Sequence, residues 1–293
     1  MLWAFVLIAT LGAAQGPYGN VWRETWENLD AWVIDVEEGM NTGNHEWEYY
    51  TNSADNVRVE VDETGANYLL LQAHYESPQY QGYNYTSGKI HSKEMLGPYG
   101  FFNVRATIPK GVGLWPAIWM FPINSSPYGA WSAGGEIDLM ETICPSPPGY
   151  ATLHFGGSQP NNTQWPWPPN NEYPFVVDWS MPHNFGVEWT PSYFRFWFDA
   201  EVMVDGNIQG TGYGYIPSSQ WWSQNAAGQH YPLNAPFDAP ENMILNLAIG
   251  GDWTCATAGC CDQAAVQASM PINMTVNFVE WWQMVYRETP IVT

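Results

Sequence analysis

Basic side chains are scarce in this chain of 293 residues. Lys and Arg together number 8, against 29 Asp and Glu, so the formal net charge is -21. Proteins that bind nucleic acid need a basic surface that neutralises phosphates, and this composition therefore argues against nucleic acid as a partner. An uncharged ligand, such as a neutral sugar polymer, feels no net repulsion from an acidic protein.

Long apolar runs are also lacking. The run at residues 1–14 is too short to cross a bilayer and ends in small residues, which is typical of a signal peptide, although it contains no Lys or Arg. No other stretch could form a membrane helix, so we expect no membrane partner. N-x-S/T sequons occur at Asn84, Asn124, Asn161 and Asn273. We predict a secreted, extracellular glycoprotein with a signal peptide at 1–14 and one domain at 15–293, since all-β folds of this length are often single domains.

Cysteines are few, at Cys144, Cys255, Cys260 and Cys261. A zinc site is one alternative, but the C-x4-C-C spacing is not a standard zinc pattern. In a secreted protein disulfide bonds are expected instead. We predict one bridge within the 255–261 loop and a second from Cys144 to that cluster, although spacing alone does not fix the pairing.

Helical periodicity is absent from every long segment, and 23 Pro and 27 Gly would interrupt long helices. Short runs rich in Val, Ile, Phe, Tyr and Trp alternate instead with Gly, Pro, Asn and Ser. Such runs lie at Asn56–Asp62, Tyr68–His74, Phe101–Pro109, Gly135–Thr142, Phe185–Thr190, Tyr193–Phe198, Met243–Ile249 and Val276–Val285. They predict an all-β fold, an antiparallel β-sandwich. The stretch Gly210–Pro236 has little strand pattern and is predicted to be a long surface loop near the site.

Aromatic side chains are abundant, with 18 Trp, 17 Tyr and 12 Phe. Core packing accounts for part of them. Trp is, however, rarely buried completely, so we expect some of these rings to line a surface. Flat rings with polar edges suit stacking on the apolar faces of pyranose sugars.

Three acids alternate with apolar residues in Gly135–Thr142. Residues two apart on a strand share a face, so Glu136 and Asp138 point the same way. Glu141 lies at an odd offset from Glu136 and would point the opposite way on a regular strand. A β-bulge near Met140 would return Glu141 to the acidic face, and bulges are common beside active sites.

Crowded carboxyl groups on one face are costly unless their pKa values separate or they share protons. Such a separation is what glycoside hydrolysis requires, because one carboxylate attacks while a protonated partner donates to the leaving oxygen. A solvated strand face and a metal site are the alternatives, and the metal ligands of such a site are unknown. Trp115, Trp119 and Trp131 precede the acids and favour a sugar cleft over a calcium site.

These residues resemble glycoside hydrolase family 16, and specifically its laminarinase-like endo-β-1,3-glucanases. The family core W-P-A-x-W-M-x-P, followed by W-P-x-S-G-E-I-D-x-M-E, is similar to Trp115–Pro122 and Trp131–Glu141. The extra Met distinguishes this branch from the lichenases, whose motif is one residue shorter. Further similar segments are Asn44–Thr51, Tyr85–Ile90, Tyr99–Pro109, Thr152–His154, His183–Phe198, Phe237–Trp253 and Val279–Val285. The resemblance covers about residues 20–287 in the expected order, and it implies a concanavalin A-like jelly roll with a concave substrate cleft.

The resemblance implies roles by position. Glu136 corresponds to the nucleophile and Glu141 to the general acid/base, with Asp138 between them tuning the proton balance. Substrate-binding positions by the same comparison are Asn44, Trp115, Trp131 and His154. For His154 a satisfied core histidine is the alternative, and core packing explains Trp119 and Trp253 nearly as well as a cleft position does.

The chain departs from the family pattern in places. Lys89 replaces an Arg, so a forked sugar contact becomes a single point contact. Phe101 and Asn103 replace Arg and Glu. Glu280 replaces an Asp that in many members helps to bind calcium on the convex face, which leaves a structural calcium ion open, and no cofactor is required for the reaction.

We therefore expect a monomeric retaining endo-glycosidase that cleaves laminarin-type β-1,3-glucan. Two enzymatic alternatives are a mixed-linkage β-1,3-1,4-glucanase and a galactanase of the same family. A third is a non-catalytic β-glucan recognition protein, but such proteins typically lack the catalytic acids that are present here.

Overall fold

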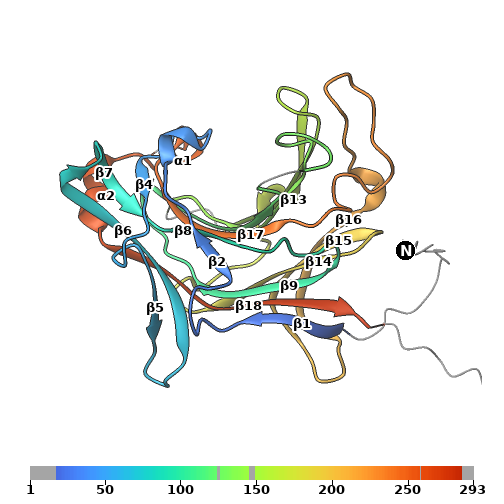
Figure 1. The fold of residues 1–293 in the computed structure, drawn as a ribbon, viewed down its shortest axis with the longest axis horizontal. Helices are drawn as coiled ribbons and strands as arrows, with labels where there is room; N and C mark the ends of the chain where they lie inside the picture. Colours follow the sequence, from blue (N-terminus) through green and yellow to red (C-terminus); the bar gives the residue numbers. More distant parts are fainter. Residues whose placement is uncertain (1–17, 124–125, 145–148, 258, 286–293) are drawn as a thin grey trace, which may run out of the picture.

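A computed structural model describes residues 18–123, 126–144, 149–257 and 259–285 of the chain. Within these ranges the chain forms two stacked, mainly antiparallel β-sheets and two short helices (Figure 1), which confirms the predicted β-sandwich. None of the helices in the described ranges is long and apolar enough to cross a membrane. The predicted signal peptide at residues 1–14 lies outside the described residues.

The outer, convex sheet has eleven strands in the described part of the chain. Its main path, in spatial order, is β16 (Ile208–Pro217), β15 (Tyr193–Val202), β14 (His183–Trp189), β9 (Gly100–Thr107), β18 (Ile272–Met284), β6 (Asn67–Tyr80), β7 (Tyr83–Ser87), β4 (Glu48–Tyr50) and β3 (Glu37–Glu38). Off this path, β1 (Tyr18–Glu24) pairs with β18, and β5 (Val57–Val61) pairs with β6. All of these pairings are antiparallel except that of β4 with β7.

The inner, concave sheet has seven strands in the same part of the chain. Their spatial order is β13 (Asn162–Glu172), β12 (Tyr150–Gly156), β11 (Glu136–Glu141), β10 (Leu114–Phe121), β17 (Asn242–Ile249), β8 (Lys89–Ser92) and β2 (Trp32–Ile34). Strand β11, which carries the three predicted catalytic acids, therefore lies inside this sheet, between β10 and β12.

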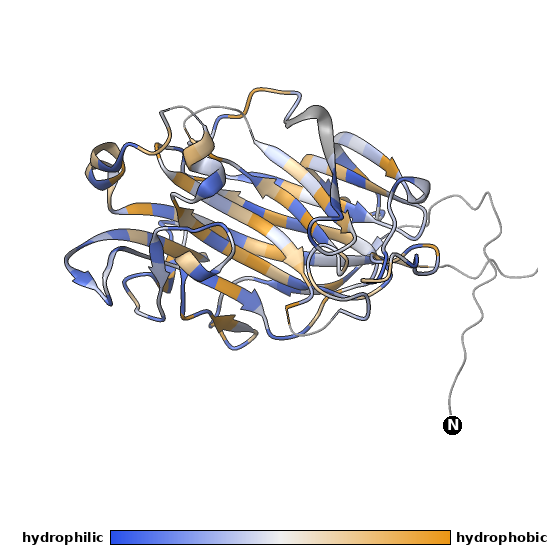
Figure 2. Cartoon of the chain, turned by 90° about the horizontal axis from the view of Figure 1, so that it is seen from above, coloured by the Kyte–Doolittle hydropathy of each residue, from blue (hydrophilic) through white to orange (hydrophobic). Residues whose placement is uncertain are grey.

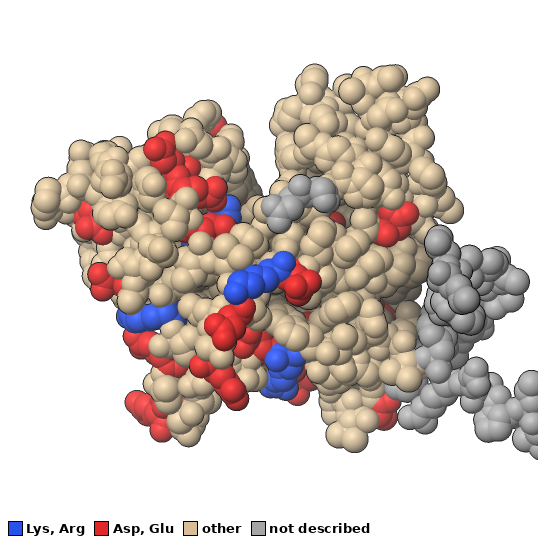
Figure 3. Space-filling view, viewed as in Figure 1, with Lys and Arg blue, Asp and Glu red and all other residues tan. Residues whose placement is uncertain are grey.

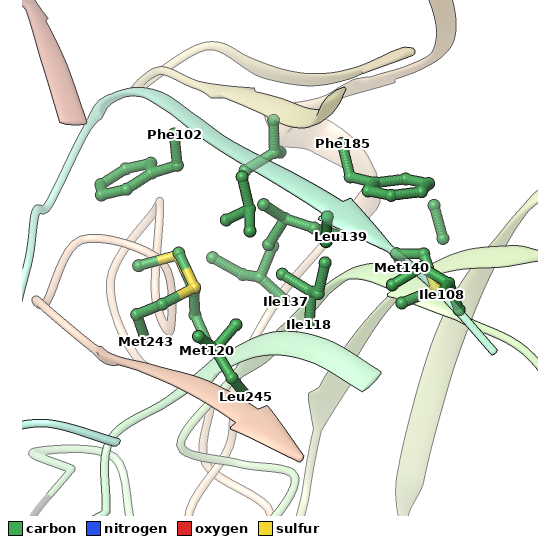
Figure 4. Close-up of a cluster of buried hydrophobic side chains, with 14 of the residues drawn as sticks. Phe102, Ile108, Ile118, Met120, Ile137, Leu139, Met140, Phe185, Met243 and Leu245 are labelled. Atoms are coloured by element: carbon green, nitrogen blue, oxygen red, sulfur yellow. The ribbon is translucent and has the colours of Figure 1, made fainter. Parts of the chain in front are cut away.

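The hydrophobic core lies between the two sheets. Along β15 buried and more exposed residues alternate, so that Phe194, Phe196 and Phe198 face inward, as the period of two requires. Figure 2 shows such alternation as orange and blue bands along the strands. Figure 4 shows Phe102 and Phe185 of the outer sheet packing over aliphatic and Met side chains of the inner sheet. Each of the eight predicted strand segments overlaps an observed strand.

The prediction of one long loop over Gly210–Pro236 was wrong for its first third. Residues up to Pro217 belong to β16, which is followed by a single 3-10 turn at Ser218–Gln220. Three glycines hide this strand in the sequence, and one is needed for packing, since a Cβ at Gly210 would lie 2.5 Å from the Cα of Ala200. Residues 221–236 remain an irregular loop, and they do not line the cleft described below.

Two short helices follow the inner sheet, α1 (Asp252–Ala256) and α2 (Gln263–Ser269). Disulfide bonds join Cys255 to Cys261 between them and Cys144 to Cys260. Both predicted bridges are thus present. The second ties the segment after strand β11 to the helical segment, across 116 residues of sequence.

The two disulfides should differ in what they contribute to stability. A disulfide stabilises the fold by lowering the entropy of the unfolded chain, and the effect grows with the length of the closed loop. The expected stabilisation is about 5 kcal/mol for Cys144–Cys260 and about 2 kcal/mol for Cys255–Cys261. We expect the double variant Cys144→Ala/Cys260→Ala to lose correspondingly more unfolding free energy than Cys255→Ala/Cys261→Ala, measured by guanidinium denaturation. Equal losses would contradict this ranking.

Candidate active site

A cleft of about 800 Å³ runs over the concave face of the inner sheet. Figure 3 shows the molecule hollowed between two raised walls, and Figure 1 places β4 and α1 on one side and β13 on the other. Residues lining the cleft include Asn44, Trp115, Trp119, Trp131, Glu136, Asp138, Glu141, Thr152, His154, Gln159, Gln164, Asn246 and Trp253. All seven predicted catalytic and substrate-binding residues are among them, together with Trp119 and Trp253.

A bulge in β11 brings the three acids to this one face. On one side of the strand the pairing passes from Asp138 opposite Thr152 to Glu141 opposite Tyr150, three residues against two. On the other side it skips Leu139. The predicted bulge is therefore present, and Leu139, next to the predicted Met140, is the extra residue.

The core gains from the same bulge. Ile137, Leu139 and Met140 are all completely buried and belong to the main hydrophobic cluster. Figure 4 shows their side chains pointing into the space between the sheets. With two consecutive residues directed to the core, Glu136, Asp138 and Glu141 are all left facing the cleft.

Glu136 is held by a Trp and a His from the neighbouring structure. The Nε1 of Trp131 donates a 2.8 Å hydrogen bond to Oε2, and the Nε2 of His154 lies 3.8 Å from Oε1. Burial raises the pKa of Glu136 well above its usual range, and the adjacent charge of Asp138 raises it further, while His154 and the Trp131 hydrogen bond oppose these effects. The side chain is still 16% exposed, so it reaches the cleft.

Asp138 lies deeper than the two glutamates, with a side chain 3% exposed. Burial raises its pKa to about 8, and a hydrogen bond with Glu136 works in the opposite direction. Its Oδ2 lies 3.3 Å from the Nε2 of His154. Two neighbouring carboxyl groups can hold one proton between them, which removes the repulsion that two ionised groups would feel.

Glu141 lies at the other end of the strand, where the Nε1 of Trp115 donates a 3.0 Å hydrogen bond to its Oε1. Burial raises the pKa of Glu141 to about 8, and the charge of Asp138 adds to this, while His154 and the Trp115 hydrogen bond lower it. The carboxyl is therefore mainly protonated at pH 7. Such a group can donate a proton at neutral pH.

Aromatic rings form much of the cleft on the Glu141 side. The ring of Trp253 packs edge-on against Trp115 at 5.2 Å and is tilted against Tyr150 at 5.0 Å. Asn44 lies in a loop at the edge of the cleft. Its backbone carbonyl accepts a 2.7 Å hydrogen bond from the amide of Asp252, which holds this loop against α1. Trp253, for which core packing was a nearly equal explanation, thus lies at the cleft.

A hydrogen-bonded network that the sequence analysis missed supports the wall near Trp119. The Nε1 of Trp119 donates to the side chain of Asn246 at 2.8 Å, and Asn246 donates to the hydroxyl of Tyr50 at 3.1 Å. That hydroxyl in turn donates to Glu46 at 3.1 Å. The sequence did hold a signal for this network. The segment Asn44–Thr51 resembles the family, and alternate residues of an extended segment, such as Glu46 and Tyr50, share a face.

Lys89 is the one Lys or Arg that lines the cleft among the described residues. Its Nζ lies 2.7 Å from Glu37, and it is placed over the rings of Tyr50 and Trp119 at 5.6 and 5.7 Å. The ammonium group that was predicted to make a single contact with a sugar is therefore already paired with Glu37. Its positive charge is compensated within the wall.

Glu241 is a second feature that sequence reasoning missed. It is 1% exposed, and neither carboxyl oxygen has a hydrogen-bond partner among the described residues. Burial raises its pKa well above the usual range, and the charges of Glu136 and Asp138 raise it further. A carboxyl group for which burial favours the neutral form is thus placed close to Gly135, at the start of strand β11.

Two places could be considered for a metal ion. Glu136, Asp138 and His154 offer ligand atoms within 4.8 Å of one another, but burial raises the pKa of both carboxyls, which opposes the ionised form that a metal binds. Glu280, at the predicted calcium position, has one oxygen 2.7 Å from Arg23, and its other oxygen accepts a hydrogen bond from Trp282. Its charge is matched by a guanidinium, so Glu280 does not offer an unpaired carboxylate to a calcium ion.

Known proteins resemble this chain in sequence. The glucan endo-1,3-β-glucosidase A1 of Niallia circulans is 33% identical over 251 residues, which cover 84% of this chain and 33% of that protein. The β-glucanase of Rhodothermus marinus is 30% identical over 294 residues, which cover 94% of this chain and 90% of the relative. The chain thus spans about one third of the first relative and nearly all of the second.

Similarity extends to the fold and to the family. The solved structure of the laminarinase from Rhodothermus marinus superimposes with a TM-score of 0.69 at 26% identity, over 92% of this chain and 98% of that one. The model of the family described as glycosyl hydrolases family 16 matches residues 38–227, which include all three acids of the bulged strand. The chain therefore belongs to glycoside hydrolase family 16 and has the jelly-roll fold of its laminarinases.

Proposed function

We propose that the protein hydrolyses β-1,3-glucan internally by the retaining mechanism. The observation that carries the proposal is the bulged strand, which directs three carboxyl groups into one cleft lined by Trp. The names of the Niallia circulans and Rhodothermus marinus relatives, an endo-1,3-β-glucosidase and a β-glucanase, support a β-glucan as the substrate. A recognition protein without activity is disfavoured, because the acids that catalysis needs are present and held by hydrogen bonds.

The first step needs an acid and a nucleophile. Glu141, with a pKa of about 8, would donate its proton to the glycosidic oxygen as the bond breaks. Glu136 would attack the anomeric carbon and form a covalent glycosyl ester. In the second step Glu141, now ionised, would take a proton from water as the water attacks that ester and frees Glu136.

Glu136 must be ionised when it attacks, although burial favours its protonated form. In the free protein the charge of Asp138 favours the protonated form of Glu136, so the proposal requires the proton of this neighbouring pair to move to Asp138 before Glu136 attacks. The Trp131 N–H bond and the nearby His154 both stabilise the negative charge on Glu136. Asp138 would thereby tune the nucleophile without contacting the bond that breaks.

Electrostatics of the cleft favour a neutral polysaccharide. Glu37, Glu46 and the catalytic acids line the cleft, and the single lining cation, Lys89, is paired with Glu37. A sulfated galactan would therefore find no unpaired cation among the described lining residues. Mixed-linkage β-1,3-1,4-glucan, which is also neutral, remains the alternative substrate.

We also propose that the protein is secreted. Its apolar first 14 residues and its two disulfide bonds support this, because disulfides persist in oxidising compartments. The described sequon residues Asn84, Asn161 and Asn273 are exposed and thus open to glycosylation.

Replacement of the nucleophile should abolish turnover. We expect Glu136→Gln to lower the rate of laminarin hydrolysis by roughly 10⁴-fold or more, as when a covalent nucleophile is removed from other enzymes. The amide keeps the shape of the side chain, so the melting temperature and laminarin binding should stay close to wild type. Substantial residual hydrolysis by the purified variant would overturn the role of Glu136.

A good leaving group should separate the role of Glu141 from that of Glu136. We expect Glu141→Ala to lose about 10²–10⁴-fold in kcat/KM on laminarin, because the leaving oxygen is no longer protonated. On an activated aryl β-glucoside, whose leaving group needs little protonation, the kcat/KM of this variant should fall far less. Equal losses on the two substrates would contradict an acid/base role.

Hydrolysis should retain the anomeric configuration. Both glutamates project from one strand, which favours the short carboxyl separation of roughly 5–5.5 Å typical of retaining enzymes. No water then fits between nucleophile and sugar, so the β-anomer should appear first when laminarin is cleaved. Time-resolved proton NMR can detect it before mutarotation, and initial appearance of the α-anomer would refute the mechanism.

A further inference from the structure

The extra residue of the β11 bulge is held from the core side by a tyrosine. Leu139 has no paired residue on β10 or on β12, so its peptide group lies outside the regular ladders. The hydroxyl of Tyr173 donates a hydrogen bond of 3.2 Å to the carbonyl oxygen of Leu139. Both residues are buried, and a buried carbonyl needs such a partner.

Tyr173 is itself rigidly placed. Its ring stacks with Trp179 at 6.2 Å and packs against Phe175 at 5.4 Å, and its side chain is buried. Its amide donates to the carbonyl of Gly149, just before β12 begins. A Cβ at Gly149 would lie 3.0 Å from the Tyr173 ring, so the backbone approaches the ring as closely as glycine permits. The phenol is thus fixed against the strand that pairs with Glu141.

The bulge determines the direction of Glu141 but not that of Glu136. Glu136 lies before the bulge, in regular register opposite His154, whereas Glu141 lies after it, opposite Tyr150. A shift of one residue reverses the side on which every later side chain projects. Glu141 therefore faces the cleft only while the strand keeps its extra residue, here Leu139, between Asp138 and Glu141.

We infer that Tyr173 is a positioning residue that holds the bulge at Leu139 and, through it, keeps Glu141 directed into the cleft. The inference rests on the proposed function of Glu141. Tyr173 faces the core, so it acts without touching substrate, and its loss should impair the proton transfers by Glu141 but not the attack by Glu136. The first proton transfer determines kcat/KM for a substrate with a poor leaving group. The other titratable groups near its hydroxyl are Tyr213 and Glu141.

The test compares two substrates in Tyr173→Phe, which removes only the hydroxyl. We expect kcat/KM on laminarin to fall roughly tenfold, the scale of one lost buried hydrogen bond, while kcat/KM on an activated aryl β-glucoside stays within about twofold of wild type. The KM for laminarin should not change. If the role of Tyr173 were merely structural, kcat/KM would fall by the same factor on both substrates. That result, or an unchanged kcat/KM on laminarin, would overturn the inference.

Tyr85→Phe is a matched control. Tyr85 is also buried and also donates its hydroxyl to a backbone carbonyl, that of Gln263 at 3.4 Å, but it is not among the residues that line the cleft or contact the bulge. We expect this variant to leave the ratio of the two kcat/KM values unchanged. A shift of that ratio equal to the shift in Tyr173→Phe would mean that any buried hydroxyl matters alike and would overturn the inference.

Two further measurements keep the test decisive. Tyr173→Phe added to Glu141→Ala should cause no additional loss on laminarin, because no acid is left to position, and additive losses would overturn the inference. Should Tyr173→Phe not fold, Tyr173→4-aminophenylalanine keeps a ring with a donor and should preserve the substrate ratio; a changed ratio would overturn the inference. If wild type shows no hydrolysis, or Glu141→Ala no substrate dependence, the proposed function fails instead.

Discussion

The bulge at Leu139 lets strand β11 meet two demands that a regular strand cannot meet together. The core between the sheets takes Ile137, Leu139 and Met140, and the cleft takes the three acids. Strict alternation would have sent Glu141 into the core, where an unpaired carboxyl is expensive to bury. The direction of Glu141 and its hydrogen bond with Trp115 depend on this one irregular residue.

The sequence contains most of this arrangement because it is local. The spacing of Glu136, Asp138 and Glu141 requires a bulge, and the apolar residues between them show which side faces the core. Strand positions followed from β-branched and aromatic runs, and the disulfides from clustered cysteines in a chain with a signal-like start. The resemblance to a family supplied roles for Asn44 and His154, whose patterns alone indicate little.

The remaining features depend on contacts between distant segments, which no local pattern encodes. Tyr173 contacts Leu139 across 34 residues, and nothing in its neighbourhood marks it as different from the other aromatic core residues. The charge of Lys89 is matched by Glu37 only because β8 and the β3 segment meet at one wall. Strand β16 was missed because three glycines, one of which lets the backbone approach Ala200, obscure its alternation.

The buried carboxyl groups also couple folding to protons in solution. In the unfolded chain Glu136, Asp138, Glu141 and Glu241 ionise near pH 4, but folding raises all four pKa values, to about 8 for Asp138 and Glu141. The native state therefore takes up protons at neutral pH. Because it binds more protons than the unfolded state, its stability from these groups is complete below about pH 4 and declines as pH rises toward the folded values. The same burial that prepares an acid for catalysis thus makes the fold more secure in acidic surroundings than in alkaline ones.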